Sequence, residues 1–101
     1  MSVRWMRTAR IRNGKFMEAI AWAKETSAYV EKKHNVGKVG IWLDALGEVG
    51  TIRWTIDYPD MASYDKAMTA VMMDADYWKM LNKSVELFHD GGTTDQLFKM
   101  V

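Results

Sequence analysis

The chain contains no cysteine and a single proline, and it has no long run of apolar residues. Without cysteine there is no disulfide framework, no thiolate nucleophile and no cysteine-based metal site. No apolar stretch approaches the ~20 residues that a membrane-spanning helix needs. The charged residues Arg4 and Arg7 lie within the first ten residues, and no apolar segment of the kind found in signal peptides follows them. We therefore expect no signal peptide, and a soluble, cytoplasmic protein with no membrane partner.

Acidic residues are also missing from the start of the chain. Five basic residues precede the first acid, Glu18: Arg4, Arg7, Arg10, Arg12 and Lys15. We interpret them as solvated charges of an edge strand, with an anion-binding rim as the alternative. No glycine-rich phosphate loop or aromatic ladder accompanies them, and the net charge is only +1. We therefore expect no nucleic-acid partner.

Length and hydrophobic spacing predict the order of the secondary structure. The 101 residues, 49% of them hydrophobic, suffice for one core and predict a single domain over residues 1–101. Pro59 ends a strand, and Asp60 is expected to cap the helix that follows. Asp76 is expected to cap a second helical stretch after a break. The predicted elements are a strand at 3–12, a helix at 15–34, strands at 38–43 and 51–58, a helical region at 60–89 broken at 74–76, and a strand at 97–101.

This order, βαββαβ, predicts an α+β fold of the ferredoxin-like type, a four-stranded antiparallel sheet with two helices on one face. In the strand at 51–58, alternation turns one set of side chains toward the helices: Ile52, Trp54, Ile56 and Tyr58. Thr51, Arg53, Thr55 and Asp57 then point to the uncovered face. That face is mixed in polarity, so we expect a homodimer that packs sheet against sheet and closes a dimeric α/β barrel with a partly polar lumen.

Two segments resemble a known family. Residues 7–15 (RTARIRNGK) resemble the first-strand signature of NIPSNAP-like proteins: an Arg-Thr pair, an aliphatic and a basic residue, then Gly-Lys at a helix start. Residues 60–81, with Ser-Tyr, Lys-Ala and Asp-X-X-Tyr-Trp features, resemble the second helix of the wider dimeric α/β-barrel superfamily. The resemblance implies a homodimer with a cavity for a small, often hydrophobic molecule. Members include monooxygenases, haem-degrading enzymes, isomerases, lyases and proteins without assigned activity, so no single function follows.

Three residues are candidates for catalysis: Arg53, Asp57 and His89. Arg53 could bind a carboxylate or a developing enolate in a lumen of low dielectric constant. Arg53 and Asp57 lie about 13 Å apart along one strand face, so they are not a direct pair. The alternative for both is an ion pair between subunits.

Five residues are candidate ligand contacts: Arg7, Trp42, Arg53, Thr55 and Trp78. Trp42 is expected to be the aromatic residue nearest the lumen, since it alternates with the apolar face of its strand. Arg7 belongs to the segment that resembles the family signature. Both faces of the first strand carry arginine, so alternation leaves open whether Arg7 points into the barrel.

The two histidines end the predicted helices, where the helix dipole favours them structurally. The alternative is that His89 acts as a general base or an axial haem ligand. Trp78 and His89 are eleven residues apart, close to three helical turns, and could share a helix face. His34 lies at the end of the other helix, so no metal cluster is predicted. We expect no cofactor, with haem as the alternative.

The sequence therefore predicts a small homodimeric α/β-barrel protein of unassigned activity that binds a small apolar or anionic molecule. One alternative is a cofactor-independent or haem-degrading monooxygenase, or an isomerase, of the same superfamily. Another is a non-catalytic structural or regulatory dimer whose own side chains fill the lumen.

Overall fold

The computed structural model describes residues 2–101 and has the predicted ferredoxin-like α+β fold. Four antiparallel strands form one sheet in the order β2-β3-β1-β4. Their bounds are β1 Val3–Arg10, β2 Gly40–Leu43, β3 Thr51–Tyr58 and β4 Thr94–Lys99. The helices are α1 Phe16–His34, α2 Met61–Met72 and α3 Ala75–Lys83, followed by the short 3₁₀ helix η1 Ser84–Glu86.

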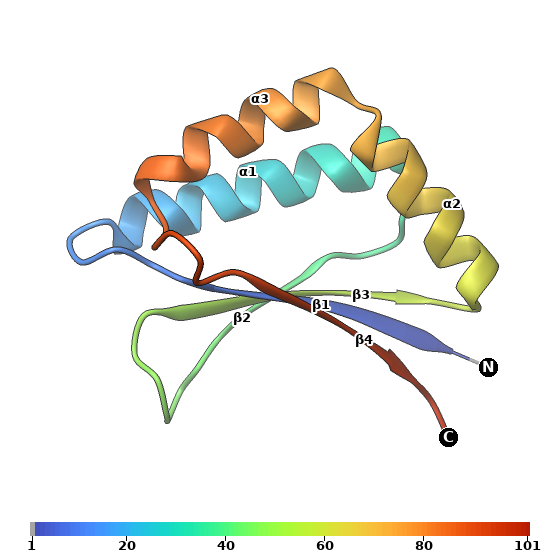
Figure 1. The fold of residues 1–101 in the computed structure, drawn as a ribbon, viewed down its shortest axis with the longest axis horizontal. Coiled ribbons are helices and arrows are strands. Elements are labelled where there is room, and N and C mark those ends of the chain that lie inside the picture. Colours follow the sequence, from blue (N-terminus) through green and yellow to red (C-terminus); the bar gives the residue numbers. More distant parts are fainter. Residues whose placement is uncertain (1) are drawn as a thin grey trace.

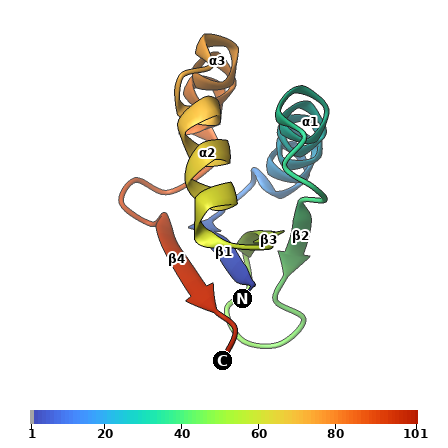
Figure 2. The same cartoon turned by 90° about the vertical axis from the view of Figure 1, so that its right-hand side faces the viewer.

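All the helices lie on one face of the sheet, and the other face is uncovered (Figure 1). Seen along the sheet, α1 lies over the β2 side, whereas α2 and α3 lie over the β4 side (Figure 2). The second predicted helix is thus two helices joined by a bend. This arrangement creates two different environments, one between the sheet and the helices and one on the open face.

The side chains of β3 divide between these environments as predicted, except that Thr51, expected in the open, is 2% exposed. Ile52 and Ile56 are 0% and 7% exposed and face the helices. In the antiparallel pairing of β1 with β3, Arg7 lies opposite Trp54, which is also buried beneath the helices. Directly paired residues share a face of the sheet. Arg7 therefore points toward the helices and not toward the open face that carries Arg53.

The buried stripe of α1 differs from the one predicted from spacing. Spacings of four and three along residues 15–34 predict a buried stripe of Phe16, Ile20, Ala23, Ser27, Val30 and His34. The structure buries Ala19, Ala23, Thr26, Ser27 and Val30. Phe16 is 44% exposed. The contact surface of α1 is rotated toward its smaller side chains, which let a helix approach the sheet closely. This rotation turns Thr26 toward the sheet.

The caps of α2 and α3 explain why the helical region bends. The Asp60 side chain accepts a hydrogen bond from the Ser63 N–H at 2.8 Å, as expected for an N-cap. At α3 the expectation that Asp76 is the cap is wrong, because Asp74 fills that position. Asp74 has an extended backbone and accepts from the N–H groups of Asp76 and Tyr77. The earlier cap sets the phase of α3, so Tyr77 is buried at 9% exposure.

The ends of three elements also differ from the prediction. The strand β1 stops at Arg10, and Ile11 makes only an isolated bridge to Phe88. The helix α3 stops at Lys83, where the Ser84 hydroxyl donates to a helix carbonyl and η1 begins. The strand β4 covers 94–99 instead of 97–101, because its partners are the residues of β1 from Val3 onward.

Candidate functional site

A cavity of about 90 Å³ lies between the sheet and the helices. Its walls come from β1, β3, the three helices and the connection between α1 and β2. Most of the lining is apolar, and its aliphatic residues are Val30, Val36, Val39, Ile56, Val71 and Leu81. An apolar cavity with a few polar groups is the usual form of a small-molecule site in proteins.

Aromatic rings form a second part of the cavity wall. Trp22 and Trp54 both line the cavity and meet edge to face, with ring centroids 6.2 Å apart. Phe88 packs edge to face on both, at 5.5 and 5.9 Å. The Trp22 indole N–H donates to the Met80 carbonyl at 2.9 Å. This hydrogen bond and the interlocked rings fix the orientation of the wall.

Two residues that line the cavity each have a buried polar atom without a hydrogen-bond partner. Trp5 of β1 and Thr26 of α1 both line the cavity. Trp5 Nε1 and Thr26 Oγ1 are buried, and neither is hydrogen-bonded to any residue between 2 and 101. A buried polar group without a partner costs roughly 1–3 kcal/mol, so such atoms are rare in folded proteins. Both atoms are inaccessible to water, so they lie behind the surface of the cavity.

Arg7 also lines the cavity, but its charge is already balanced. Its Nε and Nη2 donate to the two carboxylate oxygens of Asp95 at 2.7 and 2.9 Å. Its Nη1 makes a longer contact of 3.4 Å with the Tyr77 hydroxyl. The hydrogen bonds to Asp95 raise the pKa of the Arg7 guanidinium above its ordinary value, although burial opposes this. The guanidinium carbon also lies 5.3 Å from the ring centroid of Trp5.

The surroundings of the cavity disfavour negative charge. Tyr58 lines the cavity, and burial, followed by the influence of Tyr64, raises the pKa of its hydroxyl to about 12. The two rings pack edge to face at 5.5 Å. A tyrosine with an ordinary pKa of about 10 is already neutral at physiological pH, and this shift keeps Tyr58 neutral to still higher pH.

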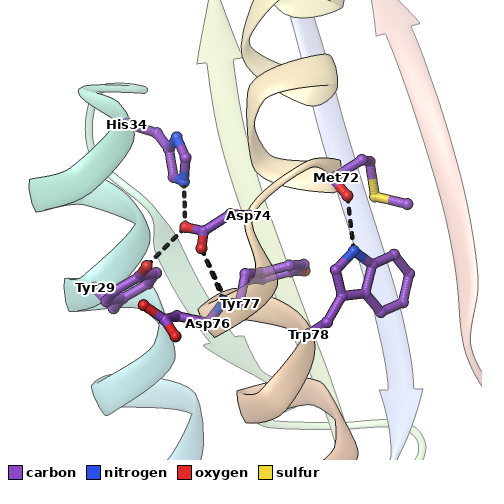
Figure 3. Close-up of polar contacts among 7 residues, drawn as sticks. All are labelled: Tyr29, His34, Met72, Asp74, Asp76, Tyr77 and Trp78. Atoms are coloured by element: carbon purple, nitrogen blue, oxygen red, sulfur yellow. Dashed lines mark hydrogen bonds and ion pairs between the residues drawn. The ribbon is translucent and has the colours of Figure 1, made fainter.

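A polar cluster at the α2–α3 bend holds one wall of the cavity in place (Figure 3). Asp74 accepts from the Tyr29 hydroxyl at 2.7 Å and lies 2.8 Å from His34 Nε2, both on α1. The hydrogen bond from Tyr29, with further bonds from His34 and two backbone N–H groups, holds the pKa of Asp74 well below its usual range. The same contact raises the pKa of Tyr29 to about 12. Asp74 thus ties α3, and with it Tyr77, to the end of α1.

The other predicted site residues gather on the open face of the sheet. Arg53 pairs within the chain with Asp44, with both contacts at 3.2 Å, and its Nη1 donates to Thr8 at 3.0 Å. Asp57 accepts two hydrogen bonds from Arg4, at 2.7 and 3.0 Å, which lower the pKa of its carboxyl group. The ion pairs expected between subunits are therefore formed inside one chain.

Trp42 and Thr55 lie beside these pairs on the same face. The Trp42 indole N–H donates to the Thr55 hydroxyl at 2.8 Å. Gly40 makes this contact possible, because a Cβ there would lie 2.6 Å from the Thr55 hydroxyl oxygen and 2.8 Å from the indole nitrogen. Trp42, Arg53 and Thr55 thus lie close together on the open face of the sheet. None of them lines the cavity under the helices.

The predicted pairing of Trp78 with His89 is wrong. The helix α3 ends before His89, which is exposed and follows η1, so the two residues do not share a helix face. The Trp78 indole N–H instead donates to the Met72 carbonyl at 2.7 Å, across the bend (Figure 3). A cavity of about 90 Å³ that His89 does not line does not fit haem. Across residues 2–101, no three His, Cys, Asp or Glu side chains come together as metal ligands.

Sequence reasoning missed Trp5, Thr26 and Tyr77 as cavity residues. Thr26 follows Ala23 at a helical spacing, so the pattern contained it, but the larger neighbouring side chains suggested a different phase. Trp5 lies two residues before Arg7 and therefore on the same face of β1, but the sequence left the direction of that face open. Tyr77 depended on which aspartate caps α3.

None of the helices in the described part of the chain is long and apolar enough to cross a membrane.

Comparisons with known proteins agree on the fold. No curated protein sequence matches the chain. A NIPSNAP family protein from Agrobacterium tumefaciens is 14% identical, with a TM-score of 0.81 over 100% of this chain and 94% of that chain. A NIPSNAP domain protein from Burkholderia xenovorans is 17% identical, with a TM-score of 0.80 over 100% and 95%.

A third solved structure bears on assembly. It is a dimeric protein of unknown function with a ferredoxin-like fold from Bacteroides fragilis, 11% identical, with a TM-score of 0.72 over 98% of this chain and 96% of that chain. At these identities the similarity shows the fold alone. The family model of NIPSNAP matches residues 4–91, which is most of the chain. The protein described here therefore belongs to the NIPSNAP family.

Proposed function

We propose that this protein binds a small, mainly apolar molecule in the cavity beneath its helices, and that it does so as a homodimer. The observation that carries the proposal is the cavity itself, whose lining is mainly apolar and includes the polar residues Arg7, Thr26 and Ser27. Voids larger than a water molecule are few in a close-packed protein interior. An apolar cavity with a few polar groups is the usual form of a small-molecule site.

Within this proposal, the predicted ligand contacts separate into two groups. Arg7 lines the cavity and is assigned to ligand binding, together with Trp5 and Thr26. Trp42, Arg53 and Thr55 are assigned to the interface between subunits, as is Asp57. Because none of the predicted catalytic residues lines the cavity, the proposed role of the cavity is binding.

The open face of the sheet supports the proposed dimer. It carries large apolar side chains in the open, with Trp42 58% and Phe98 42% exposed. A broad depression of about 550 Å³ is lined there by Met6, Phe98 and Met100, among others. The charges of Arg53 and Asp57 are matched within the chain, so the face can be covered without leaving them unpaired. The similar protein from Bacteroides fragilis is described as dimeric.

The test of binding is mass spectrometry of the purified protein under native conditions and again after denaturation. We expect a small molecule that leaves on denaturation. The matched variant is Val71→Phe, which fills the cavity from α2 and should lose the molecule while keeping the helical circular dichroism spectrum. Apo protein in both samples, with no binding to added apolar probes, would contradict the proposal.

The test of assembly is light scattering at micromolar concentration. We expect the mass of two chains of 11.7 kDa each. The variant Trp42→Glu places a charge on the open face and should shift the mass toward that of one chain. A monomer mass for the unmodified protein would contradict the dimer and leave the cavity to be tested on its own.

A further inference from the structure

We propose that the connection between β2 and β3, residues 44–50, docks its apolar tip into the depression on the open face of a second copy of this chain. The tip consists of Leu46 and Val49. This inference rests on the proposed homodimer and names the contact that joins its two open faces. Four features support it: the exposure of the tip, its fixed position, the depression at the far end of the sheet, and the balance of charge.

The tip exposes apolar side chains that the fold of one chain does not use. Among the large apolar side chains of residues 2–100, the two most exposed are Leu46 at 93% and Val49 at 98%. Single exposed apolar residues are ordinary on protein surfaces, but a group of them marks a contact surface. Two such residues on one short connection therefore indicate a surface that another molecule covers.

Polar contacts at the base of the connection fix the position of the tip. Arg53 on β3 contacts the Asp44 carboxylate through two nitrogens, each at 3.2 Å. The Gly50 carbonyl accepts from the Ile11 N–H at 2.8 Å. The tip is thus held at both of its ends. A preorganised contact loses less conformational entropy on binding than a flexible one does.

The tip and the depression lie at opposite ends of the sheet. Thr51, which follows the connection, pairs with Arg10 at one end of β1, whereas Lys99 of β4 pairs with Val3 at the other end. Both the connection and the end of β4 extend away from the helices, on the side of the open face (Figures 1 and 2). A tip therefore cannot fill the depression of its own chain, but the tip of a facing copy can.

The depression suits an aliphatic side chain. It measures about 550 Å³, and Met6, Phe98 and Met100 contribute to its lining. Methionine side chains are unbranched and flexible, so they adapt to the shape of an inserted group. In a dimer with two-fold symmetry, each tip enters the depression of the other chain, and the same contact forms twice.

Charge decides between two ways of facing the sheets. One two-fold arrangement sets tip against depression, and the other sets tip against tip. Residues 44–50 contain two acids, Asp44 and Glu48, and no base. Arg53 balances only Asp44. A tip-to-tip contact would therefore bring the Glu48 carboxylates of both chains together, which like-charge repulsion opposes.

The depression has the opposite balance of charge. Its lining includes two basic residues, Arg4 and Lys99, and one acid, Asp57. Asp57 balances Arg4, and Lys99 adds a further positive charge. A tip that carries Glu48 is thus complementary to this end of the sheet in charge as well as in polarity.

The first test measures whether the tip of one copy reaches the depression of another. The chain has no cysteine, so Ala45→Cys, which keeps Leu46 and Val49, accepts a single nitroxide spin label. Labelled chains are mixed with unmodified chains that carry ¹³C-methyl methionine, so only broadening between copies is detected. We expect the methyl signals of Met6 and Met100 to lose most of their intensity and to regain it when the nitroxide is reduced.

Two controls locate the contact. Met73 is 81% exposed and ends α2 on the helix side of the sheet, so its methyl signal should stay sharp. A spin label at Lys24→Cys, on the exposed surface of α1, should leave Met6 and Met100 sharp. The methyl signals are assigned by Met→Leu variants.

A matched pair of variants tests the energy of the contact. Val49→Ser removes an aliphatic group from the tip and should weaken the dimer about tenfold or more, because the contact forms twice. Val85→Ser makes the same change in η1, away from the open face, at a side chain that is 60% exposed. That variant should leave the dimer unchanged. Analytical ultracentrifugation measures both dissociation constants.

The outcomes separate this inference from the dimer on which it rests. Sharp signals of Met6 and Met100, in a sample whose light scattering gives the mass of two chains, would overturn the docking of the tip and leave the dimer standing. A dimer of unchanged strength in Val49→Ser would do the same. A monomer mass for the unmodified chain would overturn both the dimer and the docking.

Discussion

The two faces of the sheet treat polar side chains in opposite ways. On the open face, Arg53 is paired with Asp44, Asp57 with Arg4, and the Trp42 indole with Thr55. Beneath the helices, where an unpaired polar atom costs more, two polar atoms have no partner in residues 2–101. A paired charge on a surface is accounted for by structure. The covered face also contains the cavity, so it is the stronger candidate for ligand binding.

The largest expected change in stability comes from truncating a packed side chain, and it should differ between the two faces of the sheet. Ile52→Ala removes a side chain that is 0% exposed and should reduce the free energy of unfolding by about 3–4 kcal/mol. Thr55→Ala, on the open face of the same strand, should change it by less than about 1 kcal/mol. Urea unfolding at one fixed protein concentration measures both. Losses of similar size would contradict the division between a packed face and an open face.

The next effect tests the cluster that holds α3 against α1. The folded pKa of Asp74 lies below its unfolded value of about 3.9, so its contribution is present above that pH and is lost as the pH falls. The unfolding midpoint of the unmodified protein should therefore drop as the pH is lowered below about 5. Asp74→Asn should be less stable at pH 7 and should show a flatter dependence on pH. Thermal melts from pH 7 to pH 3 measure this.

The control for that experiment is Asp65→Asn, on the exposed surface of α2. Asp65 has no role in the cluster of Asp74, Tyr29 and His34, so the variant should follow the pH profile of the unmodified protein. A profile for Asp74→Asn as steep as that of the control would show that the cluster does not contribute to the acid loss of stability.

A smaller change in stability, here an increase, is expected when the unpaired hydroxyl of Thr26 is removed. Thr26→Val removes a buried polar atom that has no partner and should stabilise the ligand-free protein by about 1 kcal/mol. On the open face, Thr55→Val removes the acceptor of the Trp42 N–H and should not stabilise the protein. Chemical denaturation of the stripped protein measures both variants. Destabilisation by Thr26→Val would show that its hydroxyl is satisfied in solution.

The smallest effect concerns the packing of Trp42 over Gly40. Gly40→Ala places a methyl group within 3 Å of the indole nitrogen and should displace the ring at a cost of about 1 kcal/mol. Lys38→Ala, just before β2, serves as the control. Analytical ultracentrifugation should show a weaker dimer for Gly40→Ala and an unchanged one for Lys38→Ala. An equally weakened dimer for Lys38→Ala would contradict this role of Gly40.

Alternation along one strand was enough to predict both faces of β3. Tyr58 and Ile56 lie toward the helices, and Arg53 and Asp57 lie away from them, because side chains in a strand alternate with a period of two. Helix phase was harder to predict. In α3 the buried residue is Tyr77, whereas its neighbour Trp78 is 43% exposed.

The position of the site could not be predicted from local pattern. Arg7 could have pointed to either face, and only its pairing opposite Trp54 places it beneath the helices. Its partner Asp95 lies on β4, far away in the chain, and contacts it because β1 and β4 are neighbours in the sheet. Trp5 and Thr26 likewise come from different elements, and no spacing along the chain relates them.

The sequence by itself determined the order of elements, the cap at Asp60 and the apolar face of β3, since each depends on neighbouring residues along the chain. Tertiary structure alone decided which polar atoms are paired and which are not. The reason is physical: a hydrogen bond or an unfilled cavity depends on atoms brought together from distant segments. On the open face, folding pairs Arg4 with Asp57 and Arg53 with Asp44. Beneath the helices, it leaves a polar atom of Trp5 and one of Thr26 without partners among residues 2–101.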